Sequence, residues 1–178
     1  MDPDNLTLRE LVKSYADQTM CFPDDDDSEF VLSLHDGLSD EQLATLQEAW
    51  PFTIPLEYLD LLRFSSGFEN SPLESFDFDV NPESNFQELI PCGIRIATDG
   101  FGNDWVLELR RDTESIGPVW YRCHDAPVFL FQSHTLSEFI IETFKMCMGD
   151  GQSLVNVVHE EKVCGVWEND PCLLRVAD

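Results

Sequence analysis

Two strands joined by a tight turn are predicted for residues 94–109, and this hairpin constrains the fold more than any other segment. On either side of the turn, apolar side chains alternate with polar or smaller ones, which is the two-residue period of half-buried strands. The dipeptides Asp99-Gly100 and Gly102-Asn103 supply residues that tolerate the positive φ angles of a tight reversal. We therefore expect a hairpin of an antiparallel sheet, whose alternating apolar residues are Ile94, Ile96, Trp105, Leu107 and Leu109.

Four helices are predicted from capping residues that precede runs with helical apolar spacing. In three of them, a threonine or serine is followed three residues later by a glutamate or glutamine, the pair that forms a capping box. A proline opens the third helix, where its missing N–H costs nothing because the first turn has no partner for that group. These helices begin near Thr7, Ser39, Pro55 and Thr135, and we expect the first to run to about residue 19.

Further strands are predicted around the hairpin. The runs 92–98, 104–111, 118–123 and 127–131 form an antiparallel meander, because the links between them are too short for crossover helices. Residues 30–34 fit either a short strand or a buried connection. Three other segments have a β-like pattern: a short one that contains Phe76 and Phe78, and the runs 154–158 and 163–167. Together these elements predict an α+β fold, with one antiparallel sheet of about four to six strands and helices packed mainly on one face.

A single domain is expected, because 178 residues with 43% hydrophobic content fill one well-packed core and leave little room for two. The N-terminus is acidic and polar rather than a cleavable apolar leader, and no apolar run is long enough to cross a bilayer. We therefore expect a cytoplasmic protein and favour a monomer. In that compartment the six cysteines should be reduced thiols; they are Cys21, Cys92, Cys123, Cys147, Cys164 and Cys172.

The order of these elements resembles the SUKH superfamily, in its yeast cell-wall-regulator (Smi/Knr) branch. There, a helix led by proline precedes a strand, an Asp-Gly-x-Gly-Asn/Asp turn and a second strand. The segments 55–67 and 94–109 are similar to these features, 117–121 resembles the third strand, and 136–140 the closing helix. The resemblance spans roughly residues 38–145, and the turn and structural positions that it marks are Pro55, Gly67, Gly100, Gly102, Asp104 and Trp105.

The resemblance implies a protein-binding role without catalysis and without a cofactor. Members of the superfamily are mostly bacterial immunity proteins that bind and neutralise toxins, often nucleases, while a eukaryotic minority act as signalling scaffolds. The leading expectation is therefore an immunity protein whose partner is a basic toxin domain. An intracellular scaffold is the second hypothesis, and an uncharacterised enzyme is the third.

Charge supports a cationic partner. The formal net charge of −25 repels nucleic acid and anionic membranes and attracts basic proteins from a distance. Two alternatives are that the acidity only maintains solubility, or that it mimics a phosphate backbone. Two groups of residues are candidates for partner binding. The first is an acidic loop, Asp24, Asp25, Asp26 and Asp27, and the second is the aromatic residue Trp167 with the neighbouring acids Glu168 and Asp170. In contrast, Trp50, Trp105 and Trp120 lie in apolar periodic segments and are expected in the core.

Sequence motifs for catalysis or metal binding are weak. Cys123, His124 and Asp125 are adjacent, but neighbouring side chains on a strand point to opposite faces, so adjacency does not pair the thiol with the imidazole. A calcium loop counted from Asp24 has Glu29 where glycine is needed and His35 where glutamate is needed. No phosphate-binding loop or Cys-x-x-Cys pair occurs. We therefore predict no catalytic, metal or cofactor site.

Overall fold

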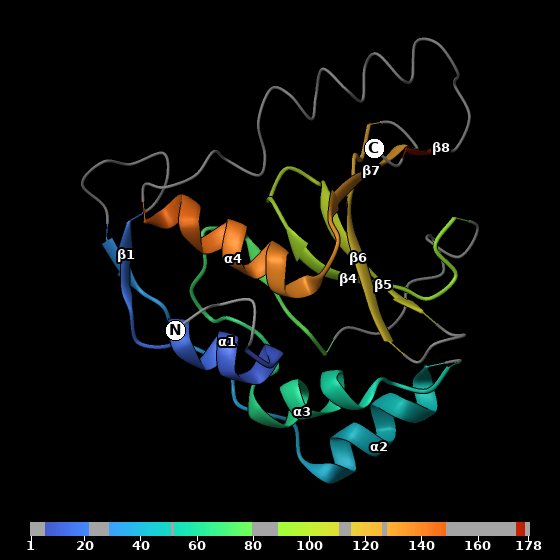
Figure 1. Cartoon of the computed structure of the whole chain (residues 1–178), viewed down its shortest axis with the longest axis horizontal. Coiled ribbons are helices and arrows are strands. Elements are labelled where there is room, and N and C mark those ends of the chain that lie inside the picture. The colour runs from blue at the N-terminus through green and yellow to red at the C-terminus, as the bar shows by residue number, and fades with distance from the viewer. Residues whose placement is uncertain are drawn as a thin grey trace.

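The computed structural model describes residues 6–21, 29–50, 52–79, 89–110, 115–125 and 128–148, together with the backbone of 174–176. Within these residues, four helices and eight strands are arranged as an α+β fold, which confirms the predicted class (Figure 1). In chain order they are α1 Leu8–Tyr15, β1 Thr19–Cys21, β2 Glu29–Val31, α2 Asp40–Ala49, α3 Leu56–Phe64, β3 Ser75–Phe76, β4 Gly93–Thr98, β5 Asp104–Arg110, β6 Ser115–Arg122, β7 Val128–Ser133, α4 Leu136–Cys147 and β8 Leu174–Val176.

The main sheet has six strands in the order β3-β4-β5-β6-β7-β8. Neighbours from β3 to β7 are antiparallel, as predicted, and Trp105 at the centre pairs with Ala97 on one side and Tyr121 on the other. The edge strand β8 pairs with β7 in parallel, which the sequence did not predict. The strands β1 and β2 form a separate two-stranded antiparallel sheet.

The helix starts follow the predicted caps. Thr7 and Ser39 each complete a capping box, and the Thr135 hydroxyl accepts a hydrogen bond from the Glu138 backbone N–H. The predicted end of the first helix is wrong, because α1 stops at Tyr15 rather than near residue 19. The chain turns through Asp17, whose φ is 62°, and then pairs as β1 with β2, so tertiary pairing overrides the helical pattern.

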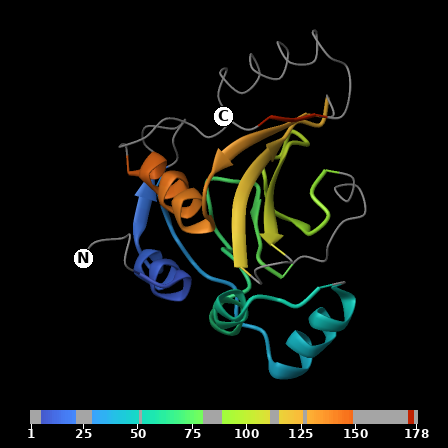
Figure 2. The same cartoon turned by 45° about the vertical axis from the view of Figure 1, so that its right-hand side comes forward.

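Helix α4 covers one face of the main sheet, α1 packs against α4, and α3 packs against α1 (Figures 1 and 2). Its predicted inward residues Phe139, Ile140, Phe144 and Cys147 are all buried. Aromatic rings dominate this core: the ring of Phe139 lies 5.5 Å from that of Phe76, measured between centroids. Among the described residues, no helix has the length and apolar character needed to cross a membrane.

The opposite face of the sheet also carries buried apolar residues. Because strand side chains alternate, Val106 lies on the reverse of Trp105 and Leu107 and joins a small cluster with Ile90, Trp120 and Phe129. The indole N–H of Trp120 donates to the Glu108 carboxylate at 3.0 Å. Trp50, Trp105 and Trp120 are therefore all buried as expected, but Trp120 belongs to this second face rather than to the main core.

Candidate interaction surface at the turn between β4 and β5

The turn between β4 and β5 is fixed by the carboxylate of Asp99. One of its oxygens accepts hydrogen bonds from the backbone N–H groups of Phe101, at 2.8 Å, and Asn103, at 3.1 Å. Its other oxygen accepts from the Asn103 side-chain amide at 2.6 Å. Gly100 and Gly102 adopt φ angles of 78° and 99°, the left-handed region that both were predicted to suit. The turn is thus held in one conformation by its own side chains.

A second connection braces the turn from the side. The Asn103 side-chain oxygen lies 3.0 Å from the His124 backbone nitrogen, which donates to it, and 3.1 Å from Nδ1 of the His124 ring. The other ring nitrogen of His124 lies 3.0 Å from an Asp125 carboxylate oxygen. The segment after β6 is therefore tied to the turn through His124.

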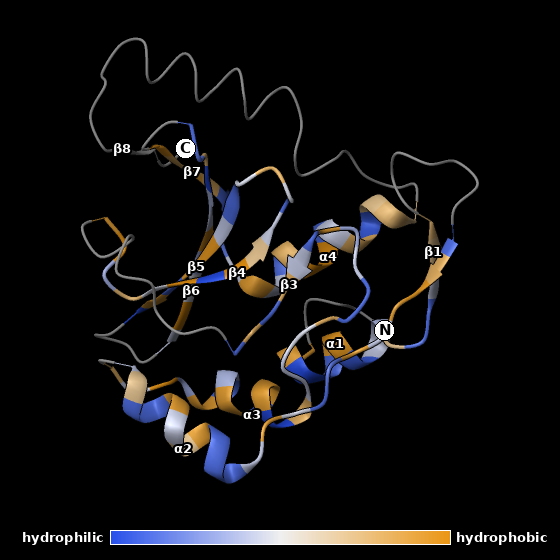
Figure 3. Ribbon diagram, turned by 180° about the vertical axis from the view of Figure 1, so that it is seen from behind, coloured by the Kyte–Doolittle hydropathy of each residue, from blue (hydrophilic) through white to orange (hydrophobic). Residues whose placement is uncertain are grey.

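Phe101 occupies the tip of this turn with 78% of its surface exposed. The turn has an apolar tip and lies at the end of the sheet away from α2 and α3 (Figure 3). Exposing a large aromatic ring to water is unfavourable, so a partner that covers the ring gains free energy. Because the turn that carries Phe101 is rigid, little conformational entropy is lost when a partner binds there. Phenylalanine, like tyrosine and tryptophan, is enriched in protein–protein interfaces relative to the rest of the protein surface.

A buried ion cluster anchors the start of β5 next to the turn. The Asp104 carboxylate is only 3% exposed and accepts from the Arg122 guanidinium through Nε, at 2.6 Å, and through a terminal nitrogen. Nη1 of Arg95 lies 3.8 Å from the other Asp104 oxygen. Two cations thus compensate one buried carboxylate, which explains why an aspartate is tolerated beside the fully buried Trp105.

Three of the positions that the resemblance marks, Pro55, Gly67 and Trp105, have the following surroundings in the structure. Pro55 is the N-cap of α3, and Trp105 is fully buried. A Cβ on Gly67 would stand 2.5 Å from the Phe76 carbonyl oxygen, so this close backbone approach requires glycine. The candidate partner-binding residues lie outside the described residues: Asp24, Asp25, Asp26, Asp27, Trp167, Glu168 and Asp170.

The sequence interpretation missed Phe101. Its signal was an aromatic residue between two turn glycines, a place where the turn itself needs no large side chain. Within the described residues, no group of three or more His, Cys, Asp or Glu side chains is arranged to hold a metal ion. The features that stand out in this part of the chain are suited to binding: a rigid turn, an exposed ring and acidic neighbours such as Asp125 and Glu74.

The model of the SMI1 / KNR4 family (SUKH-1) matches residues 37–142, more than half of the chain. The chain belongs to the SMI1 / KNR4 (SUKH-1) family. The match confirms the resemblance predicted for residues 38–145, and it extends from the start of α2 into α4, including the turn that carries Phe101. Helix α1 and strands β1, β2 and β8 lie outside the SUKH-1 match. A search of curated proteins found no significant match.

Proposed function

We propose that this SUKH-1 protein is a non-catalytic binding protein that neutralises a basic toxin domain by covering part of its surface. The observation that carries the proposal is the exposed Phe101 ring on a turn locked by Asp99. The ring supplies the apolar anchor of the interface, and the net charge of −25 supplies long-range attraction to a basic partner. Family membership supports this role, because it brings the expectation of an immunity protein.

The test is capture of the partner from the native host with the full chain as bait, beside the Phe101→Ala variant. The expected partner is a basic protein that the wild type retains and the variant loses, and whose toxicity is relieved by co-expression with the wild type. Since the ring is exposed, the variant should fold as the wild type does, which thermal unfolding would verify. An acidic partner, or equal capture by both baits, would contradict the proposal, while a harmless signalling protein would favour the scaffold role instead.

A further inference from the structure

A second surface lies along α2, at the other end of the sheet from the turn that carries Phe101 (Figures 1 and 3). It is a groove with a volume of about 410 Å³. Its apolar lining comes from Leu38, Leu46 and Ala49, and its polar lining from Glu41, Gln42, Thr45 and Asp79.

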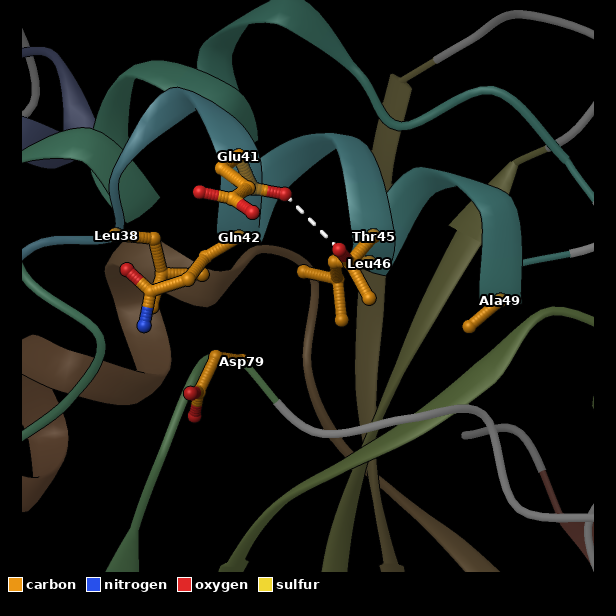
Figure 4. A pocket seen from close by; sticks show the side chains of 7 residues that line it. All are labelled: Leu38, Glu41, Gln42, Thr45, Leu46, Ala49 and Asp79. Atoms are coloured by element: carbon orange, nitrogen blue, oxygen red, sulfur yellow. Dashed lines mark hydrogen bonds between the residues drawn. The ribbon is translucent and has the colours of Figure 1, made fainter.

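Helical spacing explains why these side chains gather. Gln42, Leu46 and Ala49 are four and then three residues apart in α2, so they follow one another along one face of the helix. Asp79 comes from the segment that follows β3 and stands across the groove from α2, with its carboxylate directed away from the helix (Figure 4). The groove therefore combines an apolar stripe with carboxylates contributed by two separate parts of the chain.

Some polar groups of the groove are hydrogen-bonded within the chain, and its two carboxylates have no ion-pair partner among the described residues. The Thr45 hydroxyl donates to the Glu41 backbone carbonyl at 3.0 Å. The Gln42 side-chain oxygen accepts a hydrogen bond from the backbone N–H of the N-cap residue Ser39 at 2.9 Å. The carboxylates of Glu41 and Asp79 form no ion pair with any described residue. The nearby Arg63 pairs instead with Asp40, at 3.6 Å.

We propose that this groove binds an arginine side chain from an extended basic segment of a partner protein. The aliphatic stem would pack on Leu46 and Ala49, and the guanidinium would reach the end of the groove that Glu41 lines from α2 and Asp79 lines from the opposite wall. Charge complementarity selects this occupant, because α2 has acidic residues in its first turn and no basic residue. A second copy of the chain fits less well, since two molecules with a net charge of −25 repel each other.

The experiment titrates the isotopically labelled full chain with a synthetic peptide, acetyl-Gly-Leu-Arg-Leu-Gly-amide, and follows backbone amide shifts by NMR. The matched peptide has citrulline in place of arginine, which keeps the shape and removes the charge. We expect the arginine peptide to shift the amide signals of α2 and Asp79. The citrulline peptide should bind at least about fivefold more weakly. Because no toxin partner is needed, the result is independent of the function proposed above.

Three variants separate the groove from the general acidic field. Glu41→Gln with Asp79→Asn removes the two groove carboxylates, and Ala49→Phe fills the groove while leaving its charges; both should weaken arginine-peptide binding about fivefold. Glu29→Gln with Glu69→Gln removes the same charge from exposed positions outside the groove and should leave binding unchanged. Equal loss in this control, equal binding of both peptides, absence of α2 shifts, or self-association through α2 would overturn the proposal.

Discussion

At the residue scale, the two turn glycines have different surroundings. A Cβ on Gly102 would lie 3.1 Å from Cγ of His124, a tight contact, whereas one on Gly100 would lie 3.4 Å from the Glu74 Cβ, an ordinary contact. Since both have positive φ, Gly100→Val is expected to lower the free energy of unfolding by about 1–2 kcal/mol and Gly102→Val by about 2–3 kcal/mol. Urea denaturation measures both values.

Gly100→Asn is the control for backbone strain, because asparagine tolerates positive φ better than valine does. We expect it to cost less than Gly100→Val at the same position. Unchanged stability in both valine variants would show that the turn does not need residues in the left-handed region. It would also contradict the proposal that the turn holds the Phe101 ring in a fixed position.

Asp104 provides a second test at this scale. Its carboxylate is buried against Arg122 and Arg95, so Asp104→Asn would remove the negative charge that both guanidinium groups share. We expect a loss of about 3 kcal/mol in the free energy of unfolding, measured by chemical denaturation. Asp125→Asn is the matched control, since Asp125 is largely exposed and its loss should change stability by less than about 0.5 kcal/mol. Equal effects of the two substitutions would contradict the anchoring role of Asp104.

At the scale of elements, Glu142 on α4 gives a pH-dependent prediction. Burial raises the pKa of this carboxyl, although a hydrogen bond from Gln132 opposes the shift. A raised carboxyl pKa in the folded state favours folding at low pH, and this contribution is lost as pH rises through the folded-state pKa. Glu142→Gln should therefore raise Tm slightly at neutral pH, and the gain should disappear below the ordinary value of 4.5.

Thermal unfolding across this pH range measures the effect. Glu57→Gln on α3 is the control, because that side chain is exposed and its replacement should leave the Tm difference close to zero at every pH. A Tm gain for Glu142→Gln that persists in acid would mean that packing, not ionisation, causes it.

The features predicted correctly from the sequence are those set by residues close together in the chain. The capping boxes, the meander and the turn glycines are set by neighbouring residues, and they were predicted correctly. The end of α1 and the parallel strand β8 depend on pairing with distant segments, which no local pattern records. The exposure of Phe101 was missed because turns have no apolar period to reveal which way a side chain points.

The buried second face of the main sheet was missed for a related reason. Alternation in β5 and β6 suggests one buried face, yet Val106 and Trp120 are buried on the other side as well. A strand with apolar residues at successive positions is typical of a sheet covered on both faces, and the run Trp105-Val106-Leu107 contained that signal.

At the scale of the whole molecule, an anionic field surrounds two surfaces at opposite ends of the sheet. The field acts on encounter with a partner, because long-range attraction raises association rates and is screened by salt. The Phe101 ring acts after encounter, because short-range apolar contact slows dissociation. These contributions are separable in a kinetic experiment, and Leu56, an exposed apolar residue at the start of α3 near the other end, provides a matched control.

Recognition through the Phe101 ring and the anionic field is tested by the rate constants for binding the captured partner, measured for the wild type, Phe101→Ala and Leu56→Ala across ionic strengths. We expect Phe101→Ala to dissociate about tenfold faster or more, with association little changed, and Leu56→Ala to match the wild type. Association of all three proteins should fall steeply with added salt. Dissociation unaffected by Phe101→Ala, or association independent of ionic strength, would contradict the proposed mode of recognition.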